Sequence, residues 1–173
     1  MVALMVHEVY DNAVKKETDD EIAAELVRTQ TRASVEILAY NFQDRFKFLL
    51  PEGRAPLPDN ENPPPGLEHS NLNYEMKKMY LFYEGGADDL TQTKREMLYV
   101  ALLETINPKE AEILDYMKDH KLTELYPKLT QEVCHKAFPE VVPKPTPIKE
   151  LLRDDKGRFA KKTKKTTKKG TKK

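Results

Sequence analysis

Proline divides this chain into segments, and that division limits its fold more than any other feature. Six of the twelve prolines fall between residues 51 and 65, and four more fall between residues 139 and 147. Proline has no amide hydrogen to donate, and it keeps the residue before it out of the helical conformation. We therefore expect a helical domain at 1–138 with an internal proline-rich loop at 51–69, and a proline-rich linker with one short helical turn at 139–152. Residues 153–173 are expected to form a disordered tail, because they are low in complexity and rich in lysines that repel one another.

The segments between the prolines have the composition of helices. Glycine is scarce, with six residues, whereas the helix formers Lys, Glu, Leu, Ala and Met are abundant. The predicted fold class is all-α: a compact bundle of roughly five to six helices with proline-rich linkers and a disordered basic C-terminal tail. The spacing of apolar residues places helices at about 2–16, 20–49 (with a possible break at 29–31), 71–84, 90–106, 108–118 and 130–138.

Two helix starts carry strong local signals. Thr18 is followed by Asp19, Asp20 and Glu21, so a capping side chain precedes acids that favour the positive end of a helix. Asn107 precedes Pro108, which combines a capping side chain with proline at the first helical position.

Apolar stripes in the second half of the chain admit more than one interpretation. Leu72, Met76, Met79 and Tyr83 lie at helical spacing, with Tyr74, Tyr80 and Phe82 beside them. A core stripe is the favoured interpretation, and an exposed protein-docking face is the alternative. Residues 97–103 are apolar nearly all round, which predicts a helix packed on several sides. The loop at 51–69 is expected to be a surface loop, with a proline-rich peptide ligand as the alternative.

The formal net charge is zero, but the charges are unevenly distributed along the chain. Residues 156–173 contain ten Lys and Arg and no acid, which leaves residues 1–155 with 19 basic and 29 acidic residues, a net charge of −10. An acidic body is thus joined to a basic tail. Such asymmetry predicts a partner for the tail, or association of the tail with the body when no partner is present.

The tail is the strongest functional signal, because lysine neutralises phosphates without reading sequence and gives a steep salt dependence. It lacks the interleaved aromatic residues of a base-stacking surface. A solubilising tail, a tether to an acidic protein and, in a eukaryotic host, a nuclear-localisation signal are the alternatives. The predicted nucleic-acid-binding residues are Lys156, Arg158, Lys161, Lys162, Lys164, Lys165, Lys168, Lys169, Lys172 and Lys173.

No pattern of catalytic or metal-binding residues is recognisable. Cys134 is the single cysteine, which is typical of a reducing compartment, and His135 beside it points in another direction on a helix. Phosphate-binding and nucleotide-binding glycine motifs are absent, as is an apolar run long enough to cross a membrane. We expect a protein that is not an enzyme, holds no cofactor or metal and does not enter a membrane.

The sequence from Tyr99 to Pro139 resembles a known family. The segments that carry the resemblance are Tyr99-Val100-Ala101-Leu102-Leu103-Glu104, Pro108-Lys109-Glu110-Ala111, Lys121-Leu122, Leu129-Thr130 and Ala137-Phe138-Pro139. They are similar to an uncharacterised family, a domain of unknown function, of T4-like tailed bacteriophages, especially those infecting marine cyanobacteria. The resemblance implies a viral product in a bacterial cytoplasm, and it brings no catalytic residues.

These observations lead to one functional expectation and one alternative. The chain is expected to be a non-catalytic phage accessory protein in transcription, replication or packaging. Its helical body would bind a protein partner, and its tail would make non-specific, salt-sensitive contacts with nucleic acid. The alternative is a virion structural protein whose tail contacts the genome or an acidic neighbour. The expected location is the host cytoplasm, or the virion for the alternative.

Overall fold

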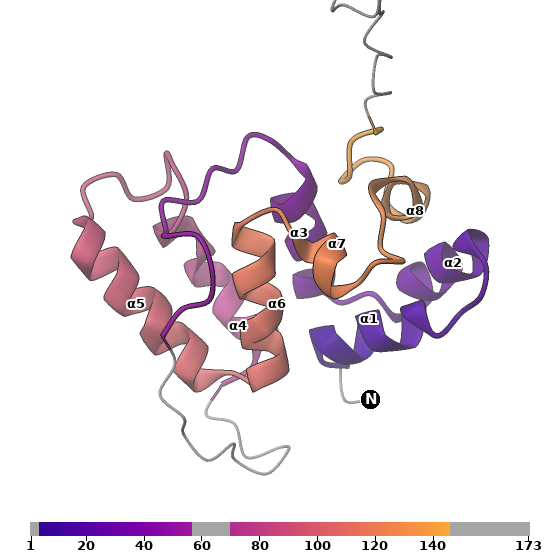
Figure 1. Cartoon of the computed structure of the whole chain (residues 1–173), viewed down its shortest axis with the longest axis horizontal. Coiled ribbons are helices and arrows are strands. Elements are labelled where there is room, and N and C mark those ends of the chain that lie inside the picture. The colour runs from indigo at the N-terminus through magenta and orange to yellow at the C-terminus, as the bar shows by residue number, and fades with distance from the viewer. Residues whose placement is uncertain (1–3, 57–69, 146–173) are drawn as a thin grey trace, which may run out of the picture.

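A computed structural model describes residues 4–56 and 70–145 of the chain, and these residues form an α-helical body (Figure 1). Along the chain, the elements are α1 (Val6–Val14), α2 (Asp19–Thr29), α3 (Arg32–Phe42), α4 (Leu72–Glu75), the 3₁₀ helix η1 (Met76–Leu81), α5 (Gln92–Thr105), α6 (Pro108–Lys118), α7 (Leu122–Leu125) and α8 (Gln131–Ala137). The all-α prediction is confirmed for this part of the chain, in which an isolated β-bridge is the one strand-like feature. The eight α-helices exceed the five to six expected.

The first extra helix arises where the predicted helix at 20–49 divides. α2 ends at Thr29, and Thr31 begins α3 because its hydroxyl accepts a hydrogen bond from the amide of Ser34. α3 then ends at Phe42 rather than near residue 49. The residues that follow leave the helix and pair with a distant segment, since the amide of Leu49 donates to the carbonyl of Phe82 at 2.8 Å.

α6 occupies the centre of the body and packs against α1, α3, α5 and α7 (Figure 1). The predicted start at Asn107 and Pro108 is confirmed, because the Asn107 side chain accepts from the amide of Lys109. α2 packs against α1 and α8 at the end of the body that is farthest from α5 (Figure 1). The core includes Tyr10, Ile37, Phe82, Leu114 and Met117, each less than 2 % exposed.

Glu110 is a fully buried carboxylate at a junction of three helices. Its carboxylate accepts from the amide of Val6 at 2.9 Å and from the amide of Leu72 at 3.4 Å. Val6 and Leu72 are the first residues of α1 and α4, and Glu110 itself lies in the first turn of α6. Three helix N-termini, whose unpaired amides carry partial positive charge, therefore meet at one negative side chain.

The packing of the body continues past residue 138, where the sequence places the end of the helical domain. Val142 is fully buried in the core, and its amide bonds the carbonyl of Phe138 at 2.9 Å. The linker therefore begins on the body itself. The predicted helical turn at 148–152, most of the loop at 51–69 and the whole tail at 153–173 lie outside the described residues.

Candidate interaction surfaces

α5 carries one exposed apolar surface of the described body. Its residues 97–103 predict packing on several sides, but α5 lies at one end of the body and packs mainly against α6 (Figure 1). Met97 is 67 % exposed and Leu98 is 37 % exposed. The prediction was wrong because α5 lies at the edge of the body, where α6 and residues 81–87 pack against one side of the helix and leave Met97 and Leu98 exposed on the other. An apolar face of α5 is thus left uncovered.

A groove of about 470 Å³ runs between this face and the segment at 50–56, and we call it the α5 groove. Its apolar surface comes from both sides, with Leu50, Pro51, Ala55 and Pro56 on the segment and Met97, Tyr99, Val100 and Ala101 on α5. Volumes of this size are typical of sites that take a large side chain or a small molecule.

Lys118 holds the segment that forms the outer wall of the groove. Its ammonium donates to the carbonyl oxygens of Pro51 at 2.8 Å and Gly53 at 2.7 Å, and it also bonds Asp119 at 2.8 Å. Asp119 accepts in turn from the amide of Gly53 at 2.8 Å. Lys118 is itself buried, so these contacts are shielded from water and fix the path of the wall.

Asp115 attaches the same wall to α5. One carboxylate oxygen accepts from the Tyr99 hydroxyl at 3.0 Å, and the other accepts from the amide of Ala55 at 3.2 Å. Burial raises the pKa of Asp115, although these two bonds and the nearby charges of Lys118 and Arg54 oppose the shift. Burial and the charge of Asp115 also raise the pKa of the Tyr99 hydroxyl, which therefore stays protonated and able to donate. The groove is built on polar contacts that the sequence alone does not indicate.

The rim of the α5 groove is acidic. Glu52, Glu96 and Glu104 line it, with no ion pair to any of them among the described residues. The two lining cations already have anionic partners: Arg54 bonds Glu112 at 2.9 Å, and Lys118 bonds Asp119. The groove thus combines an apolar floor with an excess of negative charge at its edge.

A second surface is formed by α4 and η1. The Met–Tyr stripe of the sequence separates here into two faces, because Leu72, Met76, Met79 and Phe82 are buried and confirm the core interpretation. Tyr74 and Tyr80 instead point outward, at 63 % and 49 % exposed, and the exposed lysines Lys77 and Lys78 lie between them in the sequence. We call these four residues the tyrosine face.

One cation of the tyrosine face is already positioned. The ammonium of Lys77 lies 3.3 Å from the centre of the Tyr74 ring, a cation–π contact, and Lys77 also lowers the pKa of the Tyr74 hydroxyl. Tyrosine is enriched at protein interfaces because its ring is apolar and its hydroxyl bonds water or a partner. A docking face is the alternative interpretation of the whole stripe in the sequence, whereas in the structure only Tyr74 and Tyr80 of the stripe are exposed and Tyr83 is half-buried.

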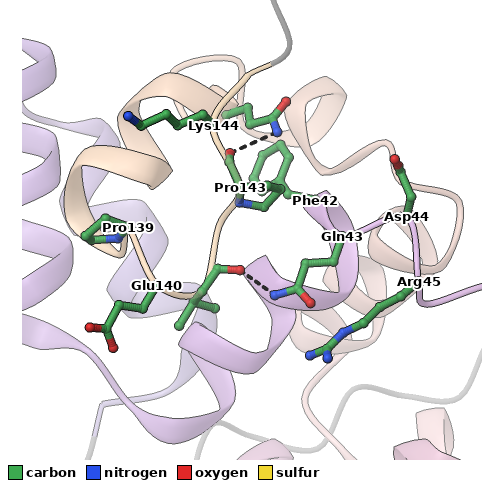
Figure 2. A pocket seen from close by; sticks show the side chains of 10 residues that line it. Phe42, Gln43, Asp44, Arg45, Pro139, Glu140, Pro143 and Lys144 are labelled. Carbon is green, nitrogen blue, oxygen red and sulfur yellow. Dashed lines mark hydrogen bonds between the residues drawn. The ribbon is translucent and has the colours of Figure 1, made fainter.

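A third surface surrounds the end of the described chain (Figure 2). A pocket of about 660 Å³, here called the tail-root pocket, has Asp44 and Arg45 on one side and Pro139 and Glu140 on the other. Its two cations, Arg45 and Lys144, match its two acids.

Two glutamines fix the backbone beside the tail-root pocket. Gln43 donates to the carbonyl of Val141, and Gln131 donates to the carbonyl of Pro143 at 3.1 Å (Figure 2). The chain therefore leaves the body at a defined place, between the end of α3 and α8.

The predicted nucleic-acid-binding residues, from Lys156 to Lys173, all lie outside the described residues, so their contacts stay a prediction. Within residues 4–56 and 70–145, no three His, Cys, Asp or Glu side chains come together as a metal site. None of the helices described is both long and apolar enough to cross a membrane.

Residues 9–124, more than half of the chain, match the model of the Family of unknown function (DUF6433). The chain belongs to this family. The DUF6433 match confirms the expected membership of an uncharacterised family, and it starts in α1, well before the segments that carry the resemblance in the sequence. The match includes the α5 groove and the tyrosine face and ends within α7, so the tail-root pocket and the tail extend beyond it. No curated protein and no solved structure matches the chain.

Proposed function

We propose that this DUF6433 protein is a non-catalytic phage accessory protein with two binding parts. The basic tail makes non-specific contacts with nucleic acid, and the helical body binds a protein partner. The phage assignment rests on the resemblance of residues 99–139 to proteins of T4-like tailed phages, and it implies action in the host cytoplasm during transcription, replication or packaging.

The observation that carries the proposal is the division of charge between body and tail. A body of net charge −10 repels a phosphate backbone, whereas ten cations without an acid attract it. Gln43 and Gln131 hold the backbone at the tail root, and the described chain ends there at residue 145, eleven residues before the first of these cations. This arrangement supports contact with nucleic acid through the tail alone.

The tyrosine face supports a protein partner for the body. Tyr74 and Tyr80 are large and exposed, and they are presented by α4 and η1, whose other side lies in the core. Such side chains provide contact area at a small loss of conformational entropy. The tyrosine face and the tail-root pocket share no residue, so a protein partner and nucleic acid would be bound by different parts of the chain.

A DNA titration at two salt concentrations tests the role of the tail. The full chain is compared with a chain ending at Leu152 and with a full-length variant in which Lys164, Lys165, Lys168 and Lys169 become glutamine. If six phosphates are engaged, the affinity of the full chain falls about 10³-fold between 50 and 200 mM salt. The four substitutions should reduce the salt slope by about 3–4, since each phosphate contact on duplex DNA contributes about 0.9.

The glutamine variant keeps the tail length and therefore separates charge from length. Loss of binding in the chain ending at Leu152, with a reduced slope in the glutamine variant, is the expected result. Unchanged affinity and slope after removal of the tail would show that the nucleic-acid contact is not made by these lysines.

A further inference from the structure

We propose that the basic segment at 156–162 of the tail folds back and docks in the α5 groove of the same chain, with Phe159 as its apolar anchor. This places an internal contact between the two parts of the protein. It depends on the groove and on the tail sequence, not on whether the tail also binds nucleic acid.

The chemistry of the groove defines its occupant. Its floor is apolar, and Met97 is two-thirds exposed at its edge, so an apolar side chain would remove this surface from water. The carboxylates of Glu52, Glu96 and Glu104 form no ion pair among the described residues, and they favour an anchor with cations on both sides. Glu96 does accept a hydrogen bond from Gln92 at 2.6 Å, but that side chain is neutral and leaves the negative charge unmatched. A purely apolar or an acidic segment would leave these carboxylates unmatched.

The segment at 156–162 meets this description, and it is the one stretch of the tail that does. Its sequence is Lys-Gly-Arg-Phe-Ala-Lys-Lys, with Phe159 between cations on either side. Phe159 is the last aromatic residue of the chain, and residues 163–173 contain only Thr, Lys and Gly. The segment offers one large side chain for the floor and four cations for the three carboxylates of the rim.

The length of the linker allows the contact within one chain. The described chain ends at Pro145, fourteen residues before Phe159, and an extended chain of that length spans about 46–50 Å. A compact body of this size has a radius of gyration of about 14 Å and is about 40 Å across. The tail leaves beside α8 and the groove lies on α5, toward the other end of the body in Figure 1, so the linker must be nearly extended.

The contact is tested in the full chain with a photoreactive benzoylphenylalanine at position 159, which preserves an aromatic ring there. Irradiation at low salt followed by mass spectrometry should place the cross-links at 50–56 and 93–104, and their yield should fall as salt is raised. Met97→Lys puts a cation at the mouth of the groove and should lower the yield about tenfold. The matched control is Leu98→Lys, which makes the same change one residue away on the same helix, outside the groove, and should leave the yield unchanged.

Further comparisons make each outcome decisive. Glu104→Gln removes a rim charge at an exposed position and should reduce the yield by a smaller factor, so the result does not depend on Met97→Lys alone. Equal losses in Met97→Lys and Leu98→Lys, or cross-links spread over the whole body, would overturn the proposal. So would cross-links between chains in a mixture of isotopically heavy and light protein, which would place the segment on a second copy. A failed DNA titration would leave the cross-link map unchanged, so the two proposals fail separately.

Discussion

At the scale of single residues, the strongest constraint on the body comes from Glu110. Its buried carboxylate accepts from the amides that begin α1 and α4, and hydrogen bonds to a charged group are worth more than those between neutral groups. A fully buried charge normally costs stability, but here the amides of two other helices offset that cost.

Glu110→Gln is expected to lower the free energy of unfolding by about 2–3 kcal/mol. Glutamine keeps one acceptor oxygen but turns an NH₂ group toward an amide that also donates, so a buried donor loses its partner. Urea denaturation measures the change. Glu112→Gln is the control, since Glu112 bonds Arg54 at the surface of the same helix and should cost less than about 1 kcal/mol. Equal losses in the two variants would contradict the role assigned to Glu110.

Gly86 is a second residue whose identity the packing dictates. A Cβ atom at this position would lie 1.9 Å from the carbonyl oxygen of Tyr80, so the backbone must move to accept any side chain. Gly86→Ala should cost about 1–3 kcal/mol in thermal or urea unfolding. Gly85→Ala is the comparison, because Gly85 has a positive φ of 84° but open space around it. A smaller loss at Gly86 than at Gly85 would refute the crowding argument.

At the scale of elements, Lys118 joins α6 to the wall of the α5 groove. Lys118→Met should cost about 1–3 kcal/mol, because the carbonyls of Pro51 and Gly53 lose a buried donor. Hydrogen exchange should also become faster at 50–56, where the amides of Gly53 and Ala55 donate to Asp119 and Asp115. Lys109→Met, which removes an exposed lysine of the same helix, is the control and should change neither quantity. Unchanged exchange at 50–56 in Lys118→Met would show that other contacts hold the wall.

The local elements of this fold were largely predictable from the sequence. The caps at Thr18 and Asn107 and the break near Thr31 depend on neighbouring residues alone, and all three are confirmed. The end of α3 at Phe42 was not predictable, because it follows from pairing between residues 47–49 and 82–84, far apart in the sequence.

The candidate surfaces were less accessible to prediction than the elements. The sequence pattern of an apolar helix such as α5 is the same whether one side of the helix is covered or several. The exposure of Met97 therefore depends on the tertiary arrangement and could not be predicted. In the sequence, Lys118 and Asp115 look like ordinary charged residues on a helix surface. They hold the groove wall only because the segment at 50–56 packs against α6 and bonds their side chains. The sequence does show that residues 97–103 are apolar nearly all round the helix, so any side of α5 that the body leaves uncovered is an apolar surface that a partner could bind.

At the scale of the whole molecule, Cys134 reports on the opening of the body. It is fully buried, and burial raises its pKa to about 12, so the reactive thiolate is scarce in the native state. Labelling with a chromogenic thiol reagent at pH 8 should be about 10³-fold slower, or more, than in urea, in keeping with ordinary domain stability. Rapid labelling without denaturant would show that α8 separates from the body easily.

Raised pKa values of buried side chains also predict how the stability of the native state changes at alkaline pH. Burial raises the pKa of Tyr10 and Tyr99 as well as Cys134, so the unfolded chain releases these protons at lower pH than the native chain does. The stability that these groups contribute is present below the unfolded pKa of about 9–10 and is lost as the pH rises beyond it.

The junction at Glu110 also sets an order of events on the ribosome. The amide of Val6 and the carboxylate of Glu110 are 104 residues apart in the chain. At about 5–20 residues per second, the nascent N-terminal helix waits roughly 5–20 seconds for its acceptor to be synthesised. α1, α2 and α3 emerge first, yet the carboxylate that completes the start of α1 arrives with α6, so this junction forms only after α6 has been synthesised. During that interval α1 can already pack against α2 and α3, whereas the apolar surface that α1 and α3 bury against α6 still lacks its partner.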